Sequence, residues 1–300
     1  MRKKHFAGVG LGLRREMIGE LIDNIPSSVD FWEVAPENWI PLGGKYQKQL
    51  SRFTGASQFV THGLSLSIGG PEPLDINFVK DVKAFLDTHN IEHYSEHLSY
   101  CSGKGHLYDL MPIPFSEEAV KYVVRRVETV QDIIERPLIL ENVSYYAAPN
   151  AKMSERDFTL AVLEESNCKI LLDVNNIYVN SINHGYDAEE FLASMPTSRI
   201  LYGHIAGHFD EADDLKVDTH GADVIQPVWD LLEKAYEIHG VFPTLLERDF
   251  NIPPINELLL EVVIRSSRKC LNFKRLSWNL SNILKIQKIN RFHILLNLGA

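Results

Sequence analysis

Short apolar runs alternate with longer amphipathic segments along the whole chain. Eight of the short runs have the length and the β-branched or aromatic content of buried strands, and the segments between them repeat apolar residues at helical spacing. The predicted strands begin near Phe6, Phe31, Phe59, Glu92, Leu138, Ile170, Ile200 and Thr244. The predicted helices cover residues 14–25, 44–53, 75–90, 116–135, 155–166, 187–195, 223–240 and 254–269.

This alternation predicts one parallel (β/α)8 barrel, because eight unbroken βα units can close a sheet on itself. A chain of 300 residues is long enough for two domains, but no low-complexity linker separates two halves. We therefore expect the barrel to occupy residues 1–270 and residues 271–300 to form a C-terminal extension. The extension is apolar with interspersed Lys, Asn and Arg, so it is either a helix packed on the barrel or a loosely ordered tail.

Charge and cysteine content narrow the function. Five of the 30 basic residues and none of the 40 acidic ones lie in residues 271–300. Residues 1–270 are therefore strongly acidic, which argues against a nucleic-acid partner. Cys101, Cys168 and Cys270 lie far apart without C-x-x-C spacing, which argues against disulfides or a thiolate zinc site and favours the cytoplasm. No apolar run reaches the roughly 18 residues that a membrane helix needs.

Metal-binding residue types stand at the C-terminal ends of the predicted strands or in the loops just beyond them. A closed barrel points these ends toward one axis, so side chains distant in sequence meet there. Crowded imidazoles and carboxylates are unfavourable unless cations lie between them. The candidate ligands are His62, His97, Glu141, Asp173, Asn176, His208, Asp218, His220 and Glu247.

Nine ligands are too many for one ion and suit two or three. Carboxylates together with histidines favour iron, manganese or zinc over magnesium or calcium. Taken alone, each residue has a simpler interpretation: a histidine can be structural, and Glu141 or Asp173 can cap a helix or pair with Arg248. Their coincidence with successive strand ends is what favours a multinuclear metal site.

Some assignments stay open at this point. His204 and His208 have the same parity in an extended strand, so one can be a core residue while the other reaches the site, and closeness to the strand end favours His208. Asn142 and Tyr100 are candidates for substrate contact, as is His184 in the loop after the sixth strand. An ordinary loop role is equally compatible with the sequence for all three.

Seven short motifs, taken in the order in which they follow one another along the chain, resemble those of the multinuclear non-haem iron-dependent oxidases. The best-known member of that family acts in methanobactin biosynthesis. This family belongs to the xylose-isomerase-like barrel superfamily, and the resemblance covers about residues 6–270. The motifs occupy residues 61–65, 96–100, 141–145, 172–180, 183–185, 204–208 and 217–220.

The resemblance implies that Glu141 bridges two irons and that Glu141, Asp173 and His208 are catalytic. The family oxidises cysteine residues of ribosomally made peptides with dioxygen, and usually needs a separate partner protein that presents the peptide. The implied ligand sets are His62, His97 and Glu141 for one iron, Glu141 with Asp173, His208 and Glu247 for the other, and Asn176, Asp218 and His220 for a third position.

Two other functions are compatible with the same ligands. A divalent-metal hydrolase or isomerase using zinc or manganese could activate water with them. The related endonuclease IV type binds three zinc ions but has a histidine where this chain has Asn176. A non-catalytic, metal-dependent binding protein is the third possibility.

Overall fold

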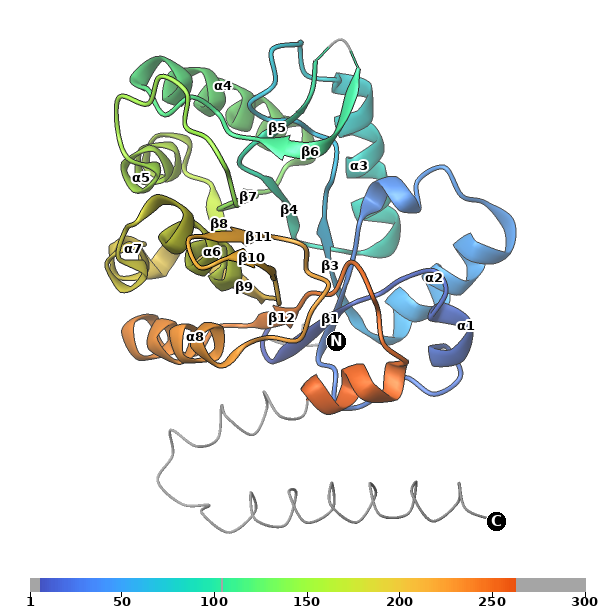
Figure 1. The fold of residues 1–300 in the computed structure, drawn as a ribbon. Helices are drawn as coiled ribbons and strands as arrows, with labels where there is room; N and C mark the ends of the chain where they lie inside the picture. The colour runs from blue at the N-terminus through green and yellow to red at the C-terminus, as the bar shows by residue number, and fades with distance from the viewer. Residues whose placement is uncertain (1–5, 104, 263–300) are drawn as a thin grey trace, which may run out of the picture. The chain divides into compact units, whose positions relative to one another are not determined.

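Eight parallel strands close into a barrel in the computed structural model, which describes residues 6–103 and 105–262 (Figure 1). Strand β12 closes the sheet, because its Thr244 lies opposite both Val9 of β1 and Gly203 of β9. The predicted (β/α)8 barrel is therefore confirmed. Its strands are β1 (Val9–Gly12), β2 (Phe31–Val34), β3 (Gln58–His62), β4 (Tyr94–His97), β7 (Leu138–Glu141), β8 (Lys169–Asp173), β9 (Ile200–Ile205) and β12 (Thr244–Leu246).

Helices cover the outside of the barrel. Several begin where a side-chain oxygen accepts a hydrogen bond from the first-turn backbone, as Asp75, Ser116 and Ser154 do. Residues 255–262 are helical up to the last described residue. The other helices are α1 (Ile18–Leu21), α2 (Gly44–Ala56), α3 (Ile76–His89), α4 (Glu117–Ile134), α5 (Glu155–Ser166), α6 (Val174–His184), α7 (Ala188–Ser194) and α8 (Gln226–His239), with short 3-10 turns at η1 (Pro36–Asn38) and η2 (Thr197–Arg199).

Helix α6 is the main departure from the prediction, which placed a strand end and a loop there. Asp173 is the last residue of β8, and its Oδ1 accepts a hydrogen bond from Asn176 N at 2.6 Å, so the helix begins at once. The segment is rich in asparagine and β-branched residues, which have low helix propensity and hide the helix in the sequence. His184 accordingly ends a helix rather than lying in a loop.

Two hairpins inserted after barrel strands were also not predicted. The first, β5 (Tyr100–Ser102) with β6 (His106–Met111), follows β4. The second, β10 (Phe209–Ala212) with β11 (Leu215–Val217), follows β9. Because each hairpin follows the C-terminal end of a barrel strand, both lie at the C-terminal face of the barrel, where the candidate ligands were expected.

The start of the chain also differs from the prediction. The first barrel strand begins at Val9 rather than near Phe6, and the first helix is much shorter than the predicted 14–25.

The predicted extension, residues 271–300, lies outside the described residues, as does the end of the predicted barrel domain. The barrel belongs to one unit of the chain that ends at Val262. No helix of residues 6–103 and 105–262 is long and apolar enough to cross a membrane.

The barrel interior has two layers. The lower layer is an apolar cluster of Phe31, Val60, Ile139, Leu171, Tyr202 and Leu245, one from each of six strands. Side chains at positions i and i+2 of a strand point to the same side, so the residue two positions later also faces inward. On the same six strands these later residues are Glu33, His62, Glu141, Asp173, His204 and Glu247.

Glu155, the first residue of α5, is a buried carboxyl group in the helical layer. Its Oε1 accepts a hydrogen bond from Asn180 Nδ2 at 3.2 Å. Burial raises the pKa of Glu155 from 4.5 to about 8. Between these two values the folded protein holds a proton that the unfolded chain has lost, so Glu155 makes the fold less stable as the pH rises through this range.

We expect the variant Glu155→Gln to remove this pH dependence. Relative to the variant, the native protein should lose roughly 1.4 kcal/mol of unfolding free energy per pH unit between about pH 5 and pH 7.5. Urea unfolding of both proteins at several pH values measures the difference, in which all other titrating groups cancel. Two stability curves that stay parallel across this range would contradict the assignment.

Candidate metal centre

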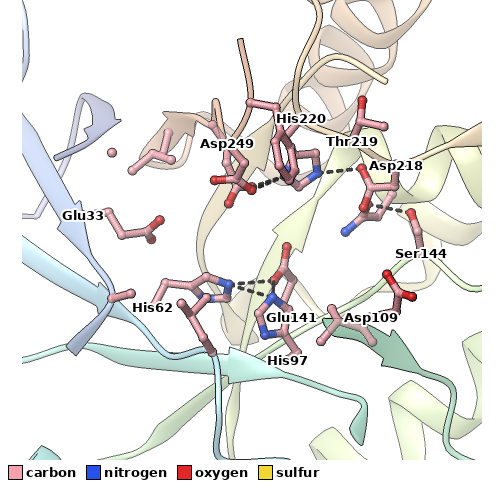
Figure 2. Close-up of a pocket in the computed structure, with 18 of the residues that line it drawn as sticks. Glu33, His62, His97, Asp109, Glu141, Ser144, Asp218, Thr219, His220 and Asp249 are labelled. Carbon is pink, nitrogen blue, oxygen red and sulfur yellow. Dashed lines mark hydrogen bonds and ion pairs between the residues drawn. The ribbon is translucent and has the colours of Figure 1, made fainter. Parts of the chain in front are cut away.

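A cavity of about 780 Å³ opens above the apolar layer, at the C-terminal ends of the barrel strands (Figure 2). This is the face on which (β/α)8 enzymes carry their active sites. Strand ends supply its floor, and hairpin β5–β6 and the segment after β11 supply part of its wall. Its polar lining includes Glu33, His62, His97, Glu141, His220 and Glu247.

Glu141 and two histidines form the first group of potential ligands. Glu141 Oε2 lies 3.1 Å from His62 Nε2 and 3.5 Å from His97 Nε2, and the two ring nitrogens are 3.1 Å apart. The three side chains come from β3, β4 and β7 and converge as Figure 2 shows. These atoms lie close enough to bind one ion together.

Glu141 also belongs to a second group, with Asp173, His204 and Glu247. His204 Nδ1 is its centre, 2.9 Å from Glu247 Oε2, 3.6 Å from Glu141 Oε1 and 3.9 Å from Asp173 Oδ2. His204 and Asp173 are fully buried. The two carboxylate oxygens of Glu141 thus face different groups, which is the geometry of a bridging ligand.

His220 is the centre of a third group on the loop after β11. Its Nε2 lies 2.6 Å from Asp218 Oδ1, and its Nδ1 lies 3.1 Å from Glu247 Oε2 and 3.2 Å from Asp249 Oδ2. Arg14 forms an ion pair with Asp249 on the outer side. Glu247 therefore connects the second and third groups as Glu141 connects the first two.

The crowded nitrogen and oxygen atoms of these groups fit bound cations, because they lie at ion-pair distance from one another without forming hydrogen bonds. Buried polar atoms are normally hydrogen-bonded, and an exception calls for an ion or another specific role. Here several potential ligand atoms, which are ring nitrogens and carboxylate oxygens, are buried, face one another and form no hydrogen bond with the described residues. They are Glu141 Oε2, Asp173 Oδ2, His204 Nδ1, His220 Nε2 and Glu247 Oε2.

Without cations, protons on the imidazoles offset the carboxylate charge. Burial disfavours the charged form of His62, but Glu141 outweighs this and raises its pKa to about 9. Burial likewise opposes charge on His204 and His220, yet Glu247 beside His204, and Asp218 followed by Glu247 beside His220, hold both pKa values well above the usual range. Metal binding must displace these protons, since only an unprotonated ring nitrogen can coordinate.

A hydrogen-bond chain fixes the orientation of two of these histidines. Tyr202 OH donates to Glu33 Oε2 at 2.8 Å, and His204 Nε2 lies 3.1 Å from the same oxygen. Ser95 Oγ contacts Tyr202 OH at 2.7 Å and His62 Nδ1 at 2.8 Å. These contacts turn His62 Nε2 and His204 Nδ1 toward Glu141. Metal-binding histidines are usually oriented in this way, by a hydrogen bond to the other ring nitrogen.

The structure brings most predicted ligands together but places His208 elsewhere. His208 lies beyond the end of β9, its Nδ1 is 2.8 Å from Asn175 Oδ1, and it belongs to none of the three groups. His204, two residues after the inward-facing Tyr202, occupies the place that the sequence favoured for His208. The physical reason is that the strand ends at Ile205, three residues before His208, whereas the sequence prediction carried the strand on to His208.

The remaining predicted residues differ in their surroundings. Asn176 lines the cavity, and its Oδ1 accepts a hydrogen bond from Ser144 Oγ at 2.7 Å. Tyr100 also lines the cavity. Asn142 does not: its side chain exchanges two hydrogen bonds with the backbone of Asp173, at 2.9 and 3.0 Å.

His184 also lies away from the cavity lining. Its ring stacks on Tyr145 with the ring centres 4.0 Å apart, and its Nε2 lies 2.8 Å from the Tyr145 carbonyl oxygen. Its partners thus give it a structural setting at the end of α6.

Sequence reasoning missed His204 as the favoured histidine, and it also missed Glu33 and Asp249. Glu33 is a charged residue inside the apolar run Phe31–Val34, two positions after Phe31, which is the signal that could have identified it. Asp249 lies outside any strand, and only the fold brings it to His220.

Comparisons with known proteins show the family and the fold of this chain. A UPF0276 protein of Shewanella sediminis is 69% identical over 256 residues, covering 85% of this chain and 92% of that protein. A UPF0276 protein of Pseudomonas aeruginosa is 53% identical over 261 residues, covering 87% and 92%. Among solved structures, the IOLI protein with a bound zinc atom has a TM-score of 0.60 at 13% identity, covering 90% of this chain and 100% of that one.

A D-psicose 3-epimerase solved in the presence of D-fructose has a TM-score of 0.57 at 11% identity, covering 88% and 98%. These likenesses define a barrel of the xylose-isomerase-like type. The sequence profile of the MbnB/TglH/ChrH family, described as RiPP precursor modification enzymes, matches residues 8–268. The chain belongs to this family, which acts on ribosomally made peptide precursors, and the resemblance noted in the sequence is confirmed.

We expect metal affinity to rise with pH, because the proton on His62, with a pKa of about 9, and those on His204 and His220 must leave. Each displaced proton should raise the Mn²⁺ affinity roughly tenfold per pH unit below that pKa. Isothermal titration of the metal-free protein at pH 6.5, 7.5 and 8.5 measures this dependence. His62→Gln should flatten it by one proton and His184→Gln should leave it unchanged, whereas a flat native profile would refute the explanation.

Proposed function

We propose that this protein is an oxidative enzyme that uses two or three iron ions and dioxygen to modify cysteine residues of a ribosomally made peptide. The observation that carries the proposal is Glu141, whose two oxygens face two ligand groups of the kind that bind transition metals. Membership of a family that modifies peptide precursors supports the kind of substrate.

His62, His97 and Glu141 would hold the first metal, and Glu141, Asp173, His204 and Glu247 the second. Asp218, His220 and Asp249, with Asn176, would hold the third. Bound iron would supply electrons for dioxygen and a cation that stabilises the deprotonated substrate thiol. Manganese or zinc in the same ligands is the alternative, in a hydrolase or isomerase that activates water.

The protein's own contribution is orientation and exclusion of water. The Ser95, Tyr202 and Glu33 hydrogen bonds hold His62 and His204 in one orientation, so these rings need no rearrangement when the site is loaded. Glu141 and Asp173 are almost completely buried, so charges around them interact through a medium of low dielectric.

The mouth of the cavity supports a peptide substrate. Four large apolar side chains line it and are nonetheless exposed: Leu64 at 40%, Met111 at 38%, Tyr146 at 52% and Phe250 at 65%. They come from the loops after β3, β7 and β12 and from β6. Exposed apolar side chains gathered at a cavity mark a binding surface, and we infer that residues beside the modified cysteine pack on them.

We further infer that a separate protein presents the peptide. We also expect the enzyme to act in the reducing cytoplasm, where Cys101 and Cys168, which are free, remain thiols.

Anaerobically purified protein should contain two to three irons per chain by elemental analysis. It should consume dioxygen and change the mass of a Cys-containing peptide encoded beside its gene, assayed with any presenter protein encoded there. Replacing the peptide cysteine by serine should abolish the mass change. Turnover by protein loaded with zinc alone would overturn the oxidative mechanism in favour of the hydrolase or isomerase.

Two buried carboxyl groups provide a matched comparison for that assay. Glu141→Gln removes the charge that joins two ligand groups and should lower turnover at least a hundredfold with loss of bound metal. Glu155→Gln changes an equally buried carboxyl group of the helical layer and should retain both.

The apolar mouth gives a separate prediction about substrate affinity. Met111→Ser and Phe250→Ser should each raise the KM for the peptide about fivefold or more, because packed apolar area is lost, and should leave kcat within about twofold. Val241→Ser, at a 51% exposed apolar side chain that does not line the cavity, is the control and should change neither. Steady-state kinetics measures both constants, and an unchanged KM in both mouth variants would contradict peptide packing there.

A further inference from the structure

The asparagines of α6 contact two segments from elsewhere in the barrel, the loop after β7 and the segment around β11. Asn176 Nδ2 donates to the Asn142 carbonyl oxygen at 3.1 Å, and Asn180 Nδ2 donates to that of Val143 at 3.0 Å, both after β7. Asn175 and Asn183 face the other segment, around β11. The helix thus connects the metal ligand Asp173, its N-cap residue, to loops that come from elsewhere in the barrel.

Asn175 makes the contact that matters most for the third group. Its Nδ2 donates to Asp218 Oδ1 at 2.9 Å, the oxygen that lies 2.6 Å from His220 Nε2. A carboxylate can only accept, so the amide nitrogen must face Asp218 and the amide oxygen must face the other way. Asn175 is completely buried, so its amide has no bulk solvent to pair with if this contact is lost.

His208 fixes the far side of the same amide. Its Nδ1 lies 2.8 Å from Asn175 Oδ1, and because an amide oxygen only accepts, Nδ1 must carry the hydrogen and donate it. The other ring nitrogen, Nε2, lies 3.7 Å from Asp210 Oδ1 and joins no ligand group. His208 is therefore oriented toward the asparagine and not toward the metal centre.

Two further contacts hold the backbone on either side of Asp218. Asn183 pairs with Lys216 through two hydrogen bonds, from Asn183 Nδ2 to the carbonyl oxygen at 2.9 Å and from Lys216 N to Asn183 Oδ1 at 2.8 Å. Asp218 N donates to Tyr146 OH at 2.9 Å. With the backbone fixed in this way, the Asn175 amide decides where the Asp218 carboxylate points.

We propose that His208 and Asn175 are positioning residues, which act in series to aim Asp218 and His220 and so determine whether the third position of the centre holds a divalent cation. This inference rests on the proposed multinuclear centre but not on its oxidative chemistry. Loss of such an outer hydrogen bond typically weakens metal binding about 10- to 100-fold. The first two ligand groups do not use this chain of contacts and should stay filled.

The test counts metal ions in full-length variants after equilibrium dialysis against Mn²⁺, with detection by mass spectrometry. The native protein should bind three ions per chain, whereas His208→Phe and Asn175→Leu should bind two at a free Mn²⁺ concentration that just saturates the native protein. His208→Asn should restore the third ion, because its amide nitrogen can take the place of Nδ1 and donate to Asn175. The rise in Tm on adding Mn²⁺ should follow the same order.

Asn180→Leu is the matched control, because Asn180 is an equally buried α6 asparagine that contacts the β7 loop and not Asp218. It should lower Tm yet keep three ions. The positioning role of His208 and Asn175 is refuted if native protein binds only two ions, if His208→Phe keeps three, or if His208→Asn fails to restore the third.

The two proposals can fail separately. If the positioning role is refuted while iron-dependent turnover is observed, the proposed reaction stands. If the positioning role is confirmed but no turnover is found, only the proposed reaction is refuted.

Discussion

Packing of six apolar side chains across the lower interior of the barrel is the constraint on which the rest of the structure depends. Because side chains along a strand alternate between two faces, fixing Ile139 inward also fixes Glu141 inward, and the same holds for Tyr202 and His204. A slip of one residue in any strand would turn that strand's contributions to both layers outward together. The apolar layer therefore sets the height and direction of the polar one, and the hydrophobic effect holds together polar groups that would otherwise repel one another.

The polar layer carries the opposite cost. Glu141 and Glu247 are carboxylates in a nearly dry environment, and neighbouring positive charge offsets the solvation that they lose on burial. Protons on His62, His204 and His220 supply that charge in the metal-free protein, and bound cations would supply it in a metal-loaded one. The same groups would then couple metal uptake, proton release and folding stability, so that free energy of metal binding would become free energy of folding.

Sequence patterns predicted the eight strands and most of the site, because both depend on local periodicity. What they missed depends on how long each element is. His204 and His208 have equal parity, and only the end of β9 at Ile205 separates them. Helix α6 starts on a cap supplied by Asp173, a residue whose chemistry also suggested a ligand. Glu33 and Asp249 reach the site through pairings between distant segments, which no local pattern contains.

Separation of the two layers has a consequence for descent. The side chains that make the barrel fold are not those that choose its reaction, although each strand carries both kinds two positions apart. Substitutions above Leu171 or Leu245 can exchange one catalytic apparatus for another while the packing beneath is conserved. The packing of the lower layer and the chemistry of the upper layer can therefore vary independently of each other.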